Sequence, residues 1–80
     1  MRKLILDDLL QIFRSVLKND NLIITELSTN YDVENWDSIN TMILINRIEK
    51  KFNIKIPIKE VMNVKSIGDI ITIVESKTIK

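Results

Sequence analysis

The sequence of 80 residues contains no cysteine, no histidine and no alanine, and only one glycine and one proline. Without cysteine or histidine the chain forms no disulfide framework, no ordinary zinc site, no cysteine nucleophile and no Ser-His-Asp triad. A single glycine does not build a phosphate-cradling loop, which needs several glycines at fixed spacing. We therefore expect a protein without catalytic residues or a metal, which receives any reactive group from elsewhere.

Apolar residues make up 45% of the chain, and 16 residues are isoleucine, whereas aromatic residues account for only 5%. A chain of this length has room for one thin aliphatic core and for no internal substrate cavity. No segment approaches the roughly 18 apolar residues of a transmembrane helix. Asp7 and Asp8 end the apolar start after three residues, too few for a signal peptide. We expect one domain over residues 1–80 that is monomeric, cytoplasmic and not bound to membranes.

Charge is distributed unevenly, although the net charge is only +1. Residues 19–37 hold five acidic residues and no basic one, whereas residues 38–80 hold eight basic and four acidic residues. The net +4 of the second segment motivates one alternative, a helical nucleic-acid-binding domain. Its basic residues are scattered and aromatic residues are few, which is typical of a solvated face. We therefore expect no nucleic-acid partner.

Apolar residues recur at helical spacing near the start of the chain. They are Leu6, Leu9, Leu10, Phe13 and Val16 or Leu17. This spacing predicts a helix over residues 4–18. Residues 19–37 show no sustained period and predict a long loop, a type of segment that is often functional. We expect the loop's apolar residues to pin it across the helices; these are Leu22, Ile23, Ile24, Leu27, Val33 and Trp36.

A second helix is predicted over residues 38–52, with Asp37 as its N-cap and Ser38 at the first helical position. Successive residues turn by about 100° around a helix. The predicted core face comprises Met42, Leu44, Ile45, Ile48 and Phe52. A second stripe on the other side comprises Ile39, Ile43, Asn46 and Lys50. The core of the helix does not need this outward stripe.

The rest of the chain predicts a connector and two further helices. Asn53 fits the end of the second helix, and Ile54 and Ile56 are expected to turn inward from an extended segment. A short helix follows over residues 57–62, beginning at Pro57. Ser66 and Asp69 have the spacing of a capping box ahead of a last helix over residues 66–77, and residues 78–80 are expected to fray. The predicted fold is an all-α four-helix bundle, with three main helices, one short helix and a long loop between the first two.

Ser38 lies where the long loop meets the second helix. A helix N-terminus offers unpaired N–H groups and the positive end of the helix dipole, which favour a phosphate group. A serine at this position is therefore a reasonable attachment point for a phosphate-linked group. Taken alone, Asp37, Ser38 and Ile39 favour the simpler interpretation, in which Asp37 and Ser38 only cap the helix.

The residues around Ser38 favour the attachment of a phosphate-linked group over simple capping. In the stretch from Asp32 to Pro57, an Asp-Ser-Ile motif opens an apolar-rich helix. The residues that follow the motif in register are Glu49, Phe52, Ile54, Ile56 and Pro57. This pattern closely resembles the acyl carrier protein family, in which Asp-Ser-Leu opens the second helix and an acidic residue, Phe, Gly and Ile precede Ile-Pro. The resemblance extends over essentially the whole chain.

The resemblance implies that Ser38 accepts 4′-phosphopantetheine from coenzyme A, and that the chain carries acyl or aminoacyl groups as thioesters on this covalent arm. A separate phosphopantetheinyl transferase, usually with Mg²⁺, would perform the attachment. A serine hydroxyl is a poor nucleophile unless a base deprotonates it, and the chain has no histidine to do so. The implied partners are the transferase and the enzymes that load and use the acyl or aminoacyl group.

The implied partner-recognition residues lie at the start and on the outward side of the second helix: Asp37, Ile39, Ile43, Asn46, Glu49 and Lys50. Asp37 would orient the transferase, and Ile39 occupies the family's Leu position, where an apolar side chain docks into partners. Carriers of fatty-acid synthesis show several acids here, in places where this chain has Ile43, Lys50 and Lys51. Charge complementarity governs encounter and exclusion of partners. We therefore expect a dedicated biosynthetic pathway rather than general fatty-acid synthesis.

Trp36, Ile43 and the chain as a whole each have a further interpretation. Trp36 before Asp37 completes a Trp-Asp-Ser-Ile motif, which resembles free-standing carriers for natural products, surface polysaccharides or unusual acyl groups; the ring itself is expected to anchor the loop. Ile43 has an alternative, in which it packs under a neighbouring loop. For the whole chain, the alternative is a helical interaction domain in which Ser38 is never modified.

Overall fold

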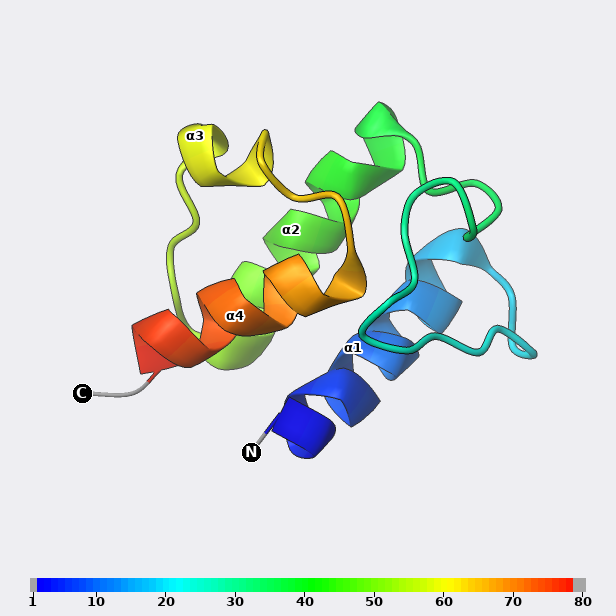
Figure 1. The fold of residues 1–80 in the computed structure, drawn as a ribbon, viewed down its shortest axis with the longest axis horizontal. Coiled ribbons are helices and arrows are strands. Elements are labelled where there is room, and N and C mark those ends of the chain that lie inside the picture. The colour runs from blue at the N-terminus through cyan, green and yellow to red at the C-terminus, as the bar shows by residue number, and fades with distance from the viewer. Residues whose placement is uncertain (1, 79–80) are drawn as a thin grey trace.

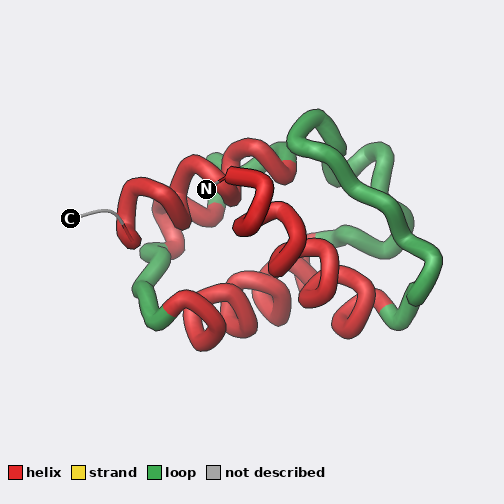
Figure 2. The backbone as a smooth tube through the Cα atoms, turned by 90° about the horizontal axis from the view of Figure 1, so that it is seen from below, coloured by secondary structure: helices red, strands yellow, loops and turns green. Residues whose placement is uncertain are grey.

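The structure, a computed structural model, describes residues 2–78 and contains four α-helices. They are α1 (Arg2–Leu17), α2 (Ser38–Phe52), α3 (Ile58–Val61) and α4 (Ile67–Thr78) (Figure 1). Over these residues the sole β-pairing is an isolated antiparallel bridge between Thr29 and Ser66. The long loop between α1 and α2 gathers at one end of the molecule (Figure 2). The predicted all-α fold with three main helices and one short helix is confirmed.

The helix boundaries differ from the predicted ones by one or two residues, except those of α2. α3 is shorter than predicted because Pro57 is its extended N-cap, with φ −60° and ψ 149°, and not its first helical residue. α4 begins one residue after the predicted start and continues through Thr78, whose Oγ1 donates to the Val74 carbonyl at 2.8 Å. The expected fraying was therefore wrong for Thr78, and residues 79–80 lie outside the described residues.

The buried face of α1 contains only some of the residues whose spacing predicts this helix. Its buried residues recur every four positions, as Ile5, Leu9, Phe13 and Leu17. Of the residues whose spacing predicts this helix, Leu9, Phe13 and Leu17 are therefore buried. The others, Leu6, Leu10 and Val16, are half-buried and pack against the core. This arrangement follows from the position of α1, which packs against both α2 and α4. A helix between two neighbours places its central stripe inward and covers its flanks only in part.

The long loop is fixed by fewer apolar residues than predicted. Ile24, Val33 and Trp36 are buried, and Leu22 packs against the core. The prediction was wrong for Ile23 and Leu27, whose side chains are 72% and 86% exposed. Leu27 lies within a tight turn, in which the Ser28 N–H donates to the Thr25 carbonyl at 3.0 Å and the Thr25 N–H donates to the Ser28 hydroxyl at 2.9 Å.

Backbone contacts join the same loop to the start of α4. The Ile67 N–H donates to the Ser28 carbonyl, and the Gly68 N–H donates to the Glu26 carbonyl, both at 2.9 Å. A Cβ atom on Gly68 would lie 3.0 Å from that Glu26 oxygen. The single glycine of the chain thus allows the loop to approach α4 closely.

The predicted capping box is present at the start of α4. The Asp69 N–H donates to the Ser66 hydroxyl at 3.2 Å, and the Ser66 N–H donates to Oδ2 of Asp69 at 3.1 Å. The same carboxylate oxygen accepts a third hydrogen bond from the Lys65 N–H at 2.8 Å. These bonds satisfy backbone donors that the first turn of a helix otherwise leaves unpaired.

A partly exposed ion-pair cluster joins α1, the loop and α4. The guanidinium of Arg2 lies 2.6 Å from Oε1 of Glu26 and also contacts the carboxylate of Glu75. The hydrogen bond from Arg2 holds the pKa of Glu26 below its ordinary value. A carboxyl group with a lowered folded-state pKa stabilises the fold above its unfolded pKa, and this contribution is lost as the pH falls through the folded-state pKa.

The substitution Glu26→Gln tests this linkage. At neutral pH the variant is expected to melt at a lower temperature than the wild type, because it lacks the charge that Arg2 stabilises. The difference should shrink as the pH falls below the ordinary glutamate pKa of about 4.3 and through the lower pKa of folded Glu26, because the wild-type carboxylate then takes up a proton and loses its charge. Thermal melts by circular dichroism across this range measure the effect, and a difference that does not change with pH would contradict it.

Candidate functional site

The start of α2 is built by Asp37. Its backbone is extended, with φ −108° and ψ −175°, and its Oδ1 accepts a hydrogen bond from the Asn40 N–H at 2.8 Å. Its carbonyl accepts from the Thr41 N–H at 2.8 Å and from the Thr41 hydroxyl at 2.7 Å. Asp37 is therefore the N-cap, as the sequence predicts, and it directs the chain into the helix.

The turn before Asp37 is fixed by hydrogen bonds to Asn35 and by the packing of Trp36. Asn35 has a left-handed backbone with φ 71°. Its carbonyl accepts from Nδ2 of Asn40 at 2.7 Å and from the Asp37 N–H at 3.0 Å. Trp36 is 5% exposed, and its ring meets Phe13 edge to face, with the ring centroids 5.1 Å apart. Trp36 is thus the loop anchor that we predicted, and it fixes the position of the next two residues.

Ser38 is exposed at the first position of α2. Within residues 2–78, the side-chain hydrogen bonds at this helix start are made by Asp37, Asn40 and Thr41, and none uses the Ser38 hydroxyl. The simple interpretation, in which the serine side chain caps the helix, is therefore wrong for Ser38 and correct for Asp37. The hydroxyl faces solvent at the positive end of the α2 dipole, where a phosphate is favoured.

An open groove of about 370 Å³ lies beside Ser38. Its lining residues come from the long loop, from α2 and from the α3 region: Asn30, Trp36, Asp37, Ser38, Thr41, Met42, Val61, Met62 and Val64. This lining combines apolar side chains with amide, hydroxyl and carboxylate groups, which suits a linear arm that has both methylene and amide groups. A phosphate-linked arm on Ser38 therefore fits the residues that are present.

The prediction that Met42 lies in the core was wrong. The Met42 side chain is 48% exposed and lines the groove together with Met62. The sequence pattern also does not indicate Val61, Met62 or Val64 as residues of the site. Their role depends on where the short α3 region lies relative to Ser38, and no sequence pattern in α3 reports that position.

The outward stripe of α2 is exposed as predicted. Ile39 is 74% exposed and Ile43 is 43% exposed, and Asn46 and Lys50 are also exposed. Ile43 is not part of the buried core cluster, which is evidence against the alternative in which a loop covers it. Glu49 differs from these residues, because it is half-buried and its Oε2 accepts from the Ile56 N–H at 2.8 Å. Its carboxylate thereby holds the connector after α2 against the helix.

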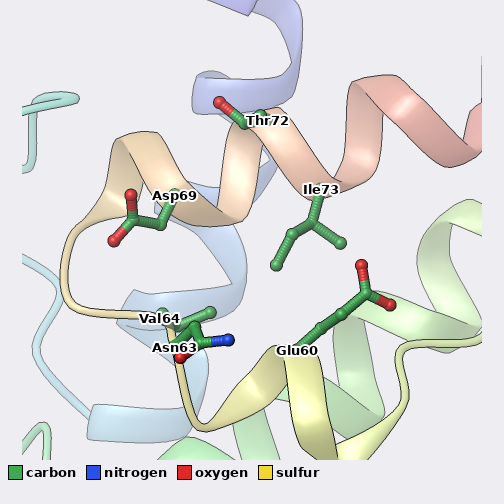
Figure 3. Close-up of a pocket in the computed structure, with 6 residues that line it drawn as sticks. All are labelled: Glu60, Asn63, Val64, Asp69, Thr72 and Ile73. Carbon is green, nitrogen blue, oxygen red and sulfur yellow. The ribbon is translucent and has the colours of Figure 1, made fainter.

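A second hollow, of about 240 Å³, lies between α3 and α4 (Figure 3). Its acidic side chains already have partners. Oδ2 of Asp69 accepts from the Ser66 N–H, and Oε2 of Glu60 lies 3.0 Å from Nζ of Lys77. Among the described residues, no three His, Cys, Asp or Glu side chains gather in a way that could hold a metal ion. The candidate site is therefore the start of α2.

Comparison with known proteins identifies the family. Residues 7–74 match the family model described as the phosphopantetheine attachment site, PP-binding. The chain belongs to the phosphopantetheine-binding carrier proteins. The structure of this carrier is similar to the solution NMR structure of holo acyl carrier protein from Geobacter metallireducens, with a TM-score of 0.82 and 35% sequence identity. The similarity covers 90% of this chain and 83% of that chain. No curated protein matches the sequence.

The family confirms the main part of the sequence interpretation. The chain is a non-catalytic carrier with the acyl carrier protein fold and a phosphopantetheine attachment site, and modification by a phosphopantetheinyl transferase follows from its family. No helix within residues 2–78 has the length and apolarity needed to cross a membrane. The narrower resemblance to free-standing carriers with a Trp-Asp-Ser-Ile motif stays a prediction.

Proposed function

We propose that Ser38 is the residue that receives 4′-phosphopantetheine, and that the loaded arm carries acyl or aminoacyl groups in a dedicated biosynthetic pathway. The observation that supports this most strongly is the exposed Ser38 hydroxyl, which α2 does not use for capping and which lies beside the groove of about 370 Å³. The bound arm supplies a thiol, on which the cargo travels as a thioester.

The other serines are poorer candidates. The hydroxyl of Ser66 caps α4, and that of Ser28 closes a loop turn. Ser76 donates to the Ile73 carbonyl near the end of α4 and lies outside the matched residues 7–74. Ser15 is exposed but lies in the last turn of α1 and not at the start of a helix. Ser38 alone among them combines a free hydroxyl with the start of a long helix.

The attachment needs chemistry that this chain does not provide. Oγ of Ser38 bonds to the phosphorus that bears the pantetheine, the bond from that phosphorus to the leaving oxygen breaks, and adenosine 3′,5′-bisphosphate leaves. The hydroxyl proton passes to a base of the transferase, because the chain contains no histidine. Ser38 therefore needs exposure and a fixed position, which the hydrogen bonds of Asp37 and Asn35 provide.

The absence of cysteine gives a direct test of the proposal. The unmodified chain has no thiol, so a thiol-reactive dye should label none. After treatment with coenzyme A, Mg²⁺ and a broad-specificity phosphopantetheinyl transferase, followed by removal of free coenzyme A, the dye should label one thiol per chain. A protein that stays without a thiol after this treatment would contradict the proposed function, and more than one thiol per chain would contradict a single attachment site.

The proposal of a dedicated pathway rests on the exposed surface of α2. The acids expected of fatty-acid-synthesis carriers are replaced by Ile43, Lys50 and Lys51, which are all exposed. Glu49 keeps an acidic residue on this helix, but its carboxylate is engaged with the Ile56 N–H. Enzymes that recognise an acidic carrier find little of that charge on this helix.

A further inference from the structure

Several apolar side chains are exposed near the start of α2, where Ser38 lies, and form an apolar surface beside it. Four large apolar side chains from α2 and the end of α3 project into solvent near it: Ile39 at 74% exposure, Met42 at 48%, Ile43 at 43% and Met62 at 76%. Met42 and Met62 line the same groove as Ser38, and Ile39 and Ile43 form the outward stripe of α2. Large contiguous apolar patches on a small soluble protein mark places where partners bind.

The same side of α2 becomes basic toward its C-terminal end. At about 100° per residue, Arg47 and Lys50 share the side of Ile39 and Ile43, and Lys51 lies beside them. All three cations are exposed. At a rise of about 1.5 Å per residue, they lie about 14–20 Å from Ser38 along the helix axis. We call the apolar surface beside Ser38 and these three cations together the docking surface.

The acidic residues between Ser38 and Lys65 do not balance the charge of these cations. Residues 38–65 contain six basic residues, all exposed: Arg47, Lys50, Lys51, Lys55, Lys59 and Lys65. The two acidic residues of the same segment are Glu49 and Glu60. Oε2 of Glu49 accepts from the Ile56 N–H at 2.8 Å, and Oε2 of Glu60 lies 3.0 Å from Nζ of Lys77. Both carboxylates are therefore engaged within the chain, so the end of the docking surface that carries Arg47, Lys50 and Lys51 is positive. At the other end, the residues before Ser38 include three exposed acids: Asp32, Glu34 and Asp37.

We propose that the enzymes acting on this carrier present an apolar depression for Ile39 and Ile43 beside their active-site entrance, and a group of carboxylates for Arg47, Lys50 and Lys51. This inference rests on the proposed function, because the docking surface is defined by its distance from the attachment serine. The spacing requires the carboxylates of the partner to lie about 14–20 Å from its entrance.

The distribution of charge favours an enzyme as the partner over a membrane or a second copy of the chain. A helix that lies on a membrane carries basic residues alongside an apolar face that runs its whole length. In α2 the exposed apolar residues occupy one end and the cations the other, and the full-length apolar face is buried in the core. A second copy of the chain brings the same three cations, Arg47, Lys50 and Lys51, to the contact, and like charges at an interface suppress binding. An enzyme with an apolar depression and a group of carboxylates beside it complements both ends.

The charges also determine which enzymes are excluded. Like charges brought together at an interface suppress binding, and complementary charges accelerate encounter by about 10-fold to 1,000-fold at low salt. A partner with a basic rim is therefore expected to act slowly on this carrier. This effect should weaken with added salt, because the Debye length falls to about 3 Å at 1 M.

Two phosphopantetheinyl transferases of known structure provide the test, one with an acidic and one with a basic rim around its carrier-binding groove. The substrates are the full-length wild type, the double variant K50E/K51E and the matched control K3E/K65E. Lys3 and Lys65 are exposed, and neither is one of the residues that define the docking surface. Each double variant changes the net charge from +1 to −3, since two reversals remove four charges. The measured quantity is kcat/KM for attachment at low and high salt.

We expect the acidic-rimmed transferase to modify the wild type at least about tenfold more efficiently than the basic-rimmed enzyme does. K50E/K51E should invert this preference, K3E/K65E should keep it, and high salt should reduce it. A preference that is absent, or that both double variants change equally, would overturn the inference. If neither transferase modifies any folded variant, the proposed function fails instead, so the two failures are distinguishable.

Two further measurements test whether a membrane or a second copy of the chain binds to the docking surface. If the wild type binds to vesicles of phosphatidylglycerol and K50E/K51E does not, the docking surface binds a membrane and not an enzyme. If sedimentation equilibrium shows a dimer that K50E/K51E disrupts and K3E/K65E does not, the docking surface binds a second copy of the chain. The inference expects neither result, and either one would overturn it.

Discussion

Replacement of Ser38 by alanine is expected to abolish phosphopantetheine attachment and to leave the thermal stability unchanged. The Ser38 side chain is exposed, and the hydrogen bonds that cap α2 are made by the side chain and backbone of Asp37. Loss of the hydroxyl removes the atom that forms the phosphate ester and disturbs no bond that holds the fold. The melting temperature by circular dichroism and the attachment assay measure the two effects separately.

Ser66 provides the matched control, because it also lies at the start of a main helix. Its hydroxyl accepts from the Asp69 N–H at 3.2 Å in the capping box of α4. Ser66→Ala should therefore lower the stability by about 1 kcal/mol, which shifts the melting temperature of a small domain by about 4–8 °C. The variant should still accept the arm in full. If Ser38→Ala destabilised the protein as much as Ser66→Ala does, the assignment of capping to Asp37 would be incorrect.

Phe13→Ala is expected to destabilise the carrier severely. The Phe13 side chain is 0% exposed, and its ring packs edge to face with Trp36 at a centroid distance of 5.1 Å. Truncation of a buried phenylalanine costs about 3–5 kcal/mol, and a domain of this size is stabilised by only about 4–12 kcal/mol in total. The variant should therefore melt far below the wild type or be unfolded at room temperature, as measured by circular dichroism and urea denaturation.

Two controls complete this test. Leu27→Ala removes a similar apolar side chain that is 86% exposed, and it should change the stability by less than about 0.5 kcal/mol. Phe13→Leu keeps most of the apolar volume but loses the ring contact, so it should fold with an altered fluorescence of Trp36, the only tryptophan of the chain. Equal stability of Phe13→Ala and Leu27→Ala would show that Phe13 is not a central part of the core.

The parts of the fold that could be predicted from the sequence are those that short-range chemistry determines. Asp37 and Asn53 delimit α2 because one accepts a first-turn N–H and the other adopts the left-handed conformation, with φ 55°. Ser66 and Asp69 open α4 for the same local reason. The outward position of Ile39 followed from helix geometry alone, since the rotation per residue does not depend on the rest of the fold.

The parts that could not be predicted depend on how distant segments meet. Met42 lines the groove instead of the core because of where α3 lies. Leu27 is exposed within a tight turn that hydrogen bonds close. The carboxylate of Glu49 binds the Ile56 N–H because the connector folds back along α2. None of these contacts has a periodic signal in the sequence, and together they define the groove and the charge around Ser38.

The central claim, that Ser38 holds the arm, is tested most directly by the intact mass of the protein. The wild type and Ser38→Ala are each incubated with coenzyme A, Mg²⁺ and a broad-specificity transferase, and their masses are measured before and after. We predict that the wild type gains the mass of one phosphopantetheine and that Ser38→Ala, folded to the same extent, gains nothing. A wild type without added mass, or a Ser38→Ala variant that gains the same mass, would contradict the claim.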